Sequence, residues 1–440
     1  MHLIFSLILF IFLGFDVLAA PGLRRSASTA HKRSFRIERV KRNDYVRNSP
    51  AALSKAYRKF GITASLMEGG DLHDFEPFSN GTSYRSASVE TQSTTETDET
   101  DETDETDEEG TVSATSVEGG SEYVSPVLIG GQNITMDFDT GSADMWVMNS
   151  NLSSSMISGH SVYNFSKSST FEKVAGEFKV SYGDSSYASG NLAKDTVNIG
   201  GAVVKNQVFG LPNKVSSSFV EDTNSNGIVG LSFSSINSFD PGPQKTFFDN
   251  VAPDLELPVF TSYLRGDRGS YEFGAIDQSL YSGMMVNVSV DSSNGFWQFD
   301  STKYKVGTGQ KLHNITTTKT AICDTGTTLL LVSPDVVSDF YSQVNGSAYS
   351  NSVGGYIYPC EAELPDLSIE IGHGFTATIP GLNLGYEEVG TNTTTGETMC
   401  YGGVQSCAGS DFQIFGDIFL RAFYVVFDQR GPSLGIAAPA

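Results

Sequence analysis

Two short stretches of the chain place an aspartate, a threonine, a glycine and a hydroxyl residue in the same order. They are residues 138–142, Phe-Asp-Thr-Gly-Ser, and residues 323–327, Cys-Asp-Thr-Gly-Thr. Glycine permits a tight backbone approach at a strand end, and the hydroxyls can hydrogen-bond a carboxylate and hold it fixed. If a two-fold axis relates the stretches, Asp139 and Asp324 meet across it and share one proton. Such a pair can bind a water and act as base and acid in one step.

A second repeat follows each stretch at nearly the same distance. Ile-Val-Gly at 228–230 begins 89 residues after Asp139, and Ile-Phe-Gly at 414–416 begins 90 residues after Asp324. One triplet is weak evidence, because ordinary turns also contain aspartate. Two copies, each followed by two apolar residues and a glycine, indicate a duplicated unit of roughly domain size.

With these motifs the chain resembles the pepsin-like aspartic proteases, and in particular the secreted fungal group of penicillopepsin and aspergillopepsin. Further stretches that carry the likeness are 226–237, 244–249, 400–406 and 415–420. The likeness spans about residues 120–440, with a weaker match across 34–61. It implies an all-β, bilobal fold, in which two related β-rich lobes hold the active site in the cleft between them.

The resemblance also implies roles for the repeated residues. Asp324 would be the base and Asp139 the acid, although such a pair titrates as a unit. The residues expected to support the pair are Thr140, Gly141, Ser142, Thr325, Gly326 and Thr327. The outer hydroxyls would bond the carboxylates, and the inner threonines would crosslink the two loops beneath the site. The alternative is the generic polarity of two turns.

A predicted hairpin after the first motif resembles the flap of the family. Tyr182 and Gly183 occupy the place of the flap tyrosine and its glycine, and Trp146 matches the tryptophan that bonds that tyrosine. Such a hairpin can cover a substrate and exclude water. Asp184 stands where an acid in fungal members is associated with accepting lysine at P1, but Ser185 replaces the usual glycine. The alternatives are an ordinary hairpin, a core tryptophan and a solvated aspartate.

The chain has four cysteines, and three pairings are possible from the sequence alone. The resemblance implies a disulfide between Cys360 and Cys400. Cys323 and Cys407 are additions to the family pattern, which can pair with each other or remain buried thiols. A reactive thiol at Cys323, beside the second aspartate, is a weaker alternative.

The N-terminal part has a composition of its own. The apolar run at 3–15 is too short for a transmembrane helix, and small residues at 17 and 19 suit signal peptidase. The predicted divisions are a signal peptide at 1–19, a basic propeptide at 20–93, an acidic disordered linker at 94–110, an N-terminal lobe at 111–290 and a C-terminal lobe at 291–440. The repeated Thr-Asp-Glu units of the linker cannot bury enough apolar surface to fold.

The basic segment has an expected partner within the chain. Residues 21–60 carry twelve Lys and Arg against two acids, whereas 111–440 carry fifteen against thirty-three. A basic head on an acidic body indicates intramolecular pairing. Residues 51–61 read as a helix ended by glycine, and by resemblance Lys55 or Lys59 would meet the catalytic aspartates. A flexible basic arm is the alternative.

Other function classes fit the sequence less well. The net charge of −23 argues against nucleic acid. The six histidines show no metalloprotease spacing and no G-x-S-x-G nucleophile motif appears, so neither metal nor cofactor is expected. A catalytically dead binding protein of the same fold is the remaining rival, but both aspartates and the flap tyrosine are present.

The sequence thus predicts an extracellular, monomeric aspartic endopeptidase made as a zymogen. It would act at acidic pH on protein and peptide substrates, prefer large apolar residues and Lys at P1, and bind pepstatin-type inhibitors and its own propeptide. No membrane anchor is expected. Sequons in the mature region mark candidate glycans at Asn133, Asn151, Asn164, Asn287, Asn314, Asn345 and Asn392.

Overall fold

The computed structural model describes most of the predicted mature region and parts of the propeptide. The described residues are 34–39, 49–60, 62, 75–78, 111–117, 122–182, 186–265, 268–309 and 311–440. The predicted signal peptide at 1–19, the acidic linker at 94–110, and Gly183 and Asp184 of the flap lie outside them. No described helix combines the length and the apolar character that crossing a membrane requires.

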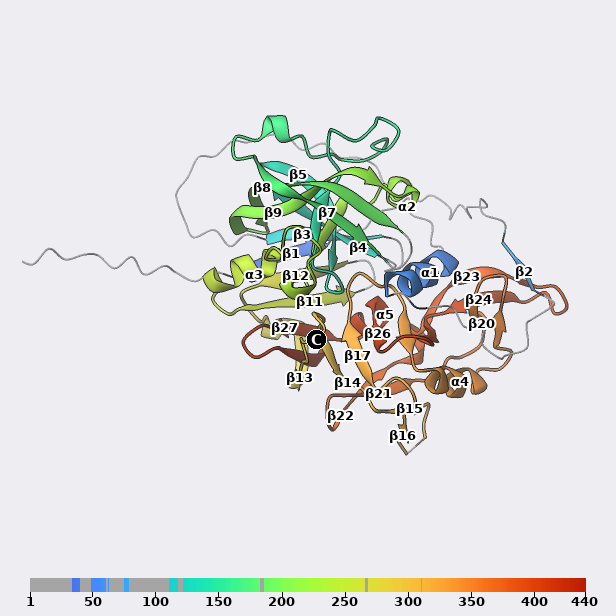
Figure 1. The fold of residues 1–440 in the computed structure, drawn as a ribbon. Helices are drawn as coiled ribbons and strands as arrows, with labels where there is room; N and C mark the ends of the chain where they lie inside the picture. Colours follow the sequence, from blue (N-terminus) through green and yellow to red (C-terminus); the bar gives the residue numbers. More distant parts are fainter. Residues whose placement is uncertain are drawn as a thin grey trace, which may run out of the picture. The chain divides into compact units, whose positions relative to one another are not determined.

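The described strands form four sheets, and the largest contains fourteen strands (Figure 1). Its order is β13 (Tyr281–Ser289), β28 (Ser433–Pro439), β27 (Tyr424–Asp428), β11 (Val259–Arg265), β12 (Arg268–Phe273), β1 (Phe35–Arg39), β3 (Thr111–Val117), β4 (Glu122–Ile129), β5 (Gln132–Asp139), β10 (Gly227–Gly230), β6 (Met145–Val147), β9 (Ala202–Val215), β8 (Tyr187–Ile199) and β7 (Glu172–Ser181). Strands β4 and β8 contain the short alternating apolar runs at 124–129 and 196–199.

The other three sheets come from the C-terminal half and from one strand of the predicted propeptide. The strand order of the first is β14 (Gln298–Asp300), β17 (Thr320–Cys323), β26 (Gln413–Phe415), β18 (Leu330–Val332) and β25 (Val404–Ser406). The order of the second is β16 (His313–Asn314), β15 (Lys303–Val306), β21 (Leu367–Ile371) and β22 (Phe375–Ile379). The order of the third is β19 (Ala348–Ser350), β20 (Gly355–Pro359), β24 (Thr398–Gly402), β23 (Gly385–Asn392) and β2 (Phe75–Pro77). Because β27 and β28 return to the large sheet, the linear division at 290 does not coincide with the division between sheets.

Helices are short and few among the described residues. They are α1 (Ser49–Lys59), α2 (Ser217–Glu221), α3 (Phe247–Val251), α4 (Pro334–Ser342) and α5 (Asp417–Leu420), with 3₁₀ turns η2 (Phe165–Lys167), η3 (Ser234–Ile236), η4 (Ala252–Asp254), η5 (Gln278–Leu280) and η6 (Gly381–Asn383). The predicted propeptide helix corresponds to α1. The predominance of strands confirms the all-β, bilobal pepsin-like fold class.

Turn chemistry explains the hairpin that leads to the first aspartate. Gly130 and Gly131 both adopt positive φ, 53° and 78°, between the paired ends Ile129 and Gln132 of β4 and β5. A two-residue turn with two left-handed residues matches the twist of adjacent strands, and glycine adopts it without a steric cost. The turn therefore fixes the register of β5, which ends at Asp139.

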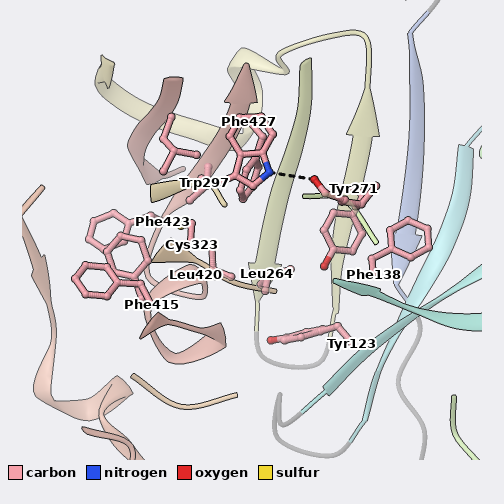
Figure 2. Packing of buried hydrophobic residues seen from close by; sticks show 14 of the residues in the cluster. Tyr123, Phe138, Leu264, Tyr271, Trp297, Cys323, Phe415, Leu420, Phe423 and Phe427 are labelled. Carbon is pink, nitrogen blue, oxygen red and sulfur yellow. Dashed lines mark hydrogen bonds between the residues drawn. The ribbon is translucent and has the colours of Figure 1, made fainter. Parts of the chain in front are cut away.

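One buried apolar cluster extends from the large sheet to the sheet of β17 and β26. Phe138 of β5 packs on Tyr271 of β12, with ring centroids 5.0 Å apart. Figure 2 shows these rings in the same cluster as Cys323 and Phe415, which belong to the second repeat. The residues next to both aspartates are therefore anchored in one continuous core, which holds the two repeats in a fixed relation.

Candidate active site

Each aspartate sits at the end of a strand that is paired with a parallel neighbour. Asp139 ends β5 and lies opposite Gly230 of β10. Asp324 directly follows β17, whose last residue, Cys323, pairs with Phe415 of β26. The two apolar-apolar-Gly repeats of the sequence thus form the strands beside the two aspartates, which accounts for their nearly equal spacing.

The glycines of the two motifs leave space for the opposite carboxylate. A Cβ on Gly141 would lie 2.5 Å from Asp324 Oδ1, and a Cβ on Gly326 would lie 2.4 Å from Asp139 Oδ1. Each glycine also donates its backbone N–H to the aspartate of its own motif, at 2.8 Å for Gly141 and 3.0 Å for Gly326. Any larger residue at either position would separate the two loops.

The outer hydroxyls hold both carboxylates in equivalent ways. Ser142 Oγ donates to Asp139 Oδ2 at 2.7 Å, and Thr327 Oγ1 donates to Asp324 Oδ2. The carboxyl groups themselves are buried, with Asp139 2% and Asp324 0% exposed. Each carboxylate is therefore fixed by one backbone and one side-chain donor, which limits its rotation.

The inner threonines connect the two loops directly. Thr140 N donates to Thr325 Oγ1 at 3.1 Å, and Thr325 N donates to Thr140 Oγ1 at 3.0 Å. Their hydroxyls then donate across the interface, Thr140 Oγ1 to the carbonyl of Cys323 at 2.9 Å and Thr325 Oγ1 to the carbonyl of Phe138 at 2.6 Å. All four bonds are buried, so this reciprocal set holds the loops in register.

One lysine of the predicted propeptide contacts both aspartates. Lys59 Nζ lies 2.6 Å from Asp139 Oδ1 and 2.9 and 2.8 Å from the two oxygens of Asp324. Its side chain is 5% exposed. Of the two lysines that the sequence left open, the structure brings Lys59, not Lys55, to the aspartates.

The pKa values of Lys59, Asp139 and Asp324 are all shifted from their ordinary values. Burial alone would lower the pKa of Lys59, but the charges of Asp139 and Asp324 raise it above its ordinary value. Burial alone would raise the pKa of Asp139, yet the ion pair with Lys59 and the hydrogen bonds from Lys59 and Ser142 lower it. Burial and the nearby Asp139 charge raise the pKa of Asp324. Asp139 therefore favours the ionised form more than Asp324 does, although the two carboxyls accept equivalent hydrogen bonds from their own motifs.

Helix α1 carries Lys59 and is held along its whole length. At its first residue, the N–H and hydroxyl of Ser49 both donate to Glu387 of β23. Leu53 and Ala56 are buried in an apolar cluster with second-lobe residues. Phe60, beyond the helix, packs against the ring of Phe412 at 5.5 Å. Hence the packing of α1, and not only the charge of Lys59, places this lysine at the aspartates.

The predicted flap contact is present among the described residues. Trp146 Nε1 donates to Tyr182 OH at 2.8 Å, and both side chains are buried. Phe219 of α2 packs edge-on against both rings, at 4.9 Å from Trp146 and 5.6 Å from Tyr182. The sequence reasoning missed Phe219, because no motif marks it.

A further carboxyl near the dyad was also missed. Asp137 lies two residues before Asp139 on β5 and is 3% exposed. Side chains alternate along a strand, so Asp137 and Asp139 point to the same face. The Asp-Phe-Asp spacing was visible in the sequence and could have indicated this second carboxyl.

The cysteines divide into one disulfide and two thiols. Cys360 and Cys400 form a disulfide. Cys323 and Cys407 are free and buried, and they belong to different apolar clusters. Burial raises the pKa of both thiols, so they are neutral at ordinary pH and lack the thiolate character of a reactive cysteine.

The sequons differ in exposure. The exposed asparagines are Asn133, Asn151, Asn287, Asn314 and Asn345. Asn164 and Asn392 are partly buried, and their side-chain oxygens accept backbone N–H groups, from Ser166 at 3.0 Å and from Thr394 at 3.0 Å. The exposed group offers the more accessible positions.

Comparison with known proteins agrees with this geometry. Residues 122–439 match the family described as eukaryotic aspartyl protease. An aspergillopepsin A-like aspartic endopeptidase of Aspergillus fumigatus is 52% identical over 100% of both chains. An aspartic protease of Coccidioides posadasii is 44% identical over 93% of this chain and 90% of its own, and penicillopepsin-1 of Penicillium rubens is 47% identical over 75% and 81%. The chain belongs to the eukaryotic aspartyl protease family.

Proposed function

We propose that this protein is the precursor of a secreted aspartic endopeptidase that cleaves peptide bonds in acid, with Asp139 and Asp324 as its catalytic pair. The observation that carries the proposal is the shared contact with Lys59. One ammonium atom lies within 2.9 Å of oxygens from both carboxylates. Two carboxyls that converge on one atom can also converge on one water once that atom leaves.

The reaction requires one ionised and one protonated carboxyl. The ionised carboxylate takes a proton from the bound water, whose oxygen attacks the scissile carbonyl carbon. The protonated carboxyl donates its proton to the carbonyl oxygen as the tetrahedral centre forms. Fixed donors from Ser142, Thr327 and the motif glycines keep both groups oriented without reorganisation.

The proton belongs to the pair rather than to one residue. The resemblance to pepsin-like proteases gives the base role to Asp324 and the acid role to Asp139. In the precursor, however, the pKa of Asp139 is lowered and that of Asp324 is raised, so Asp324 takes up a proton first. Lys59 lowers the pKa of both carboxyls, whereas the charge of Asp139 raises that of Asp324. Removal of Lys59 therefore leaves a proton that the two carboxyls share.

The same ion pair supports the zymogen proposal. While Lys59 occupies the position between the carboxylates, a water cannot be activated there. The lowered pKa of Asp139 means that the clamp is present above the ordinary aspartate pKa and is lost as the pH falls through the lowered value. Acid therefore weakens the contact that blocks the site, and the precursor should process itself.

The walls near the aspartates support a preference for large apolar side chains. Tyr182, Phe219 and Ile228 line a small cavity that also contains Asp139. The proposed acceptance of lysine through Asp184 rests on the resemblance alone. Extracellular targeting rests on the predicted signal peptide, and the Cys360–Cys400 disulfide is a feature of oxidising compartments.

The test is acid incubation of the purified precursor, with and without pepstatin, followed by N-terminal sequencing and mass spectrometry of the products. We expect self-cleavage near Thr111 and then cleavage of added protein, both blocked by pepstatin. A folded precursor that stays inert in acid, even after an external protease has cut the 94–110 linker, would overturn the proposal.

A further inference from the structure

The predicted propeptide contacts the second lobe at a place separate from the aspartates. Strand β2 pairs antiparallel with β23, with Phe75 opposite Asn392, and the N–H of Phe78 donates to the carbonyl of Val389 at 3.0 Å. In this sheet β2 is the outermost described strand, and β23 lies between it and β24. Removal of the propeptide therefore makes β23 the outermost described strand, with backbone donors and acceptors open on that side.

Gly390 of β23 leaves space for an aromatic ring on this edge. A Cβ at Gly390 would lie 2.6 Å from Cζ of Phe75, and still closer to Cε2 of that ring and to the carbonyl oxygen of Glu76. All three of these nearest atoms belong to β2. The φ of Gly390 is not in the left-handed region, so the close approach of the docked strand, and not the backbone conformation, accounts for the glycine.

The contacts of β2 with this edge do not depend on charge. Phe75 is partly buried and packs against an apolar cluster that includes Tyr386 and Val389 of β23. Glu76, the charged residue of β2, is exposed. Strand pairing uses neutral backbone groups, so acid that weakens the clamp of Lys59 leaves recognition at β23 in place.

One chain reaches both the aspartates and this edge. Helix α1 begins with Ser49, which donates to Glu387 of β23, and ends with Lys59 at the aspartates. These ends are roughly 15 Å apart along the helix axis. An extended residue spans about 3.3 Å, so a peptide bound at the aspartates needs at least about five further residues to reach β23. Phe75 follows Lys59 by 16 residues (75 − 59), which is more than enough.

We propose that residues 389–392 of β23 form a second binding site for protein substrates in the mature enzyme. The site takes an extended substrate segment as an added strand, with an aromatic side chain over Gly390. This inference rests on the proposed function and adds a remote contact to the same substrate chain. A substrate is the occupant because the propeptide vacates the aspartates and β23 together, and the chain that then enters the aspartates is a peptide long enough to reach both.

The experiment compares a hexapeptide substrate, too short to reach β23, with longer versions of it. Each longer peptide carries the sequence of residues 75–78 at a distance of 16 residues from the scissile bond, on one side or the other, and a matched peptide has alanine in place of Phe75. The processed enzymes are wild type, Gly390→Ala and Gly242→Ala. Gly242 is the control, because a Cβ there would meet no atom within 4 Å and its φ is not left-handed.

We expect the extension on one side to raise kcat/KM of the wild-type enzyme about tenfold, because the second contact forms within one bound chain. The gain should be lost in Gly390→Ala and with the alanine peptide, and kept in Gly242→Ala. Equal gains in the two glycine variants would overturn the inference, while cleavage of the hexapeptide leaves the proposed function intact. A wild-type enzyme that cuts neither substrate overturns both.

A measurement on the unmodified enzyme keeps the test valid if Gly390→Ala does not fold. A separate peptide of residues 72–80 should inhibit cleavage of the extended substrate and leave cleavage of the hexapeptide unchanged. Equal inhibition of both substrates would place the peptide at the aspartates, and no inhibition of either would likewise contradict the site. A wild-type dimer that Gly390→Ala abolishes would assign the edge to a second copy and overturn the inference.

Discussion

The two halves of the candidate site are alike at the aspartates and different two residues away. Asp139 and Asp324 each receive a motif glycine N–H and a motif hydroxyl, and each opposite glycine makes room for the partner carboxylate. The position two residues earlier is Asp137 on β5 but Ile322 on β17, which packs in an apolar cluster. The repeat is thus preserved at the two carboxylates and lost two residues before them.

The halves also differ in what covers them. Tyr182, Trp146 and Phe219 all belong to the first half, where the partly buried Phe219 packs against the two buried rings. The second half instead receives helix α1, whose first residue donates its N–H to Glu387. The two aspartate motifs are therefore symmetric, whereas the side chains around them are not. Substitutions in the motifs and in their surroundings can test this difference.

The largest expected effect is at the aspartates. Asp139→Asn and Asp324→Asn should each reduce kcat roughly 10³-fold or more, because one amide removes the shared proton of the pair. Mature enzyme should be produced by external cleavage of the linker so that activation does not confuse the result. Asp254→Asn, at an exposed carboxylate, is the matched control. Retained activity in either variant would show that the two halves are not equivalent.

The next effect is on activation. Lys59→Met removes the cation that both carboxylates share, so the precursor should process itself at a higher pH than wild type. Lys55→Met should move the threshold less, because it leaves the hydrogen bonds from Lys59 to both carboxylates in place. The measurement is the fraction processed across a pH series. Equal shifts for the two variants would contradict a clamp centred on Lys59.

The inner threonines test the symmetry through stability. Thr140→Val and Thr325→Val keep the side-chain shape and each leave buried backbone groups of the opposite loop without a partner. Each should lower the free energy of unfolding by about 1–3 kcal/mol. Denaturant titration of the inactive Asp139→Asn background avoids self-digestion. A cost confined to one threonine would show that the crosslink is not reciprocal.

The smallest effect is expected at the flap contact. Trp146→Phe and Tyr182→Phe each remove the same hydrogen bond, worth about 0.5–1.5 kcal/mol, so kcat/KM should fall only severalfold. The kcat/KM of the double variant should be no lower than that of the less active single variant, since both substitutions remove the same interaction. Fully additive losses would show that the two side chains act separately.

The local sequence determined much of this site. The Asp-Thr-Gly repeat specifies glycines that admit a neighbouring carboxylate and hydroxyls that bond it, which are short-range properties. The nearly equal spacing of the apolar-apolar-Gly repeats corresponds to parallel strands beside each aspartate. The Cys360–Cys400 pairing, in contrast, was predicted from the family resemblance, because the sequence alone allows three pairings.

Tertiary structure decided what depends on long-range packing. The choice of Lys59 over Lys55 required the position of α1 on β23, which is set by residues more than 300 apart in the chain. The position of Phe219 against the flap tyrosine came from a helix with no motif of its own. The return of β27 and β28 to the large sheet likewise joins the C-terminus to β11. A sequence pattern records local geometry, but contacts between distant segments depend on how whole elements pack, and no single stretch encodes that.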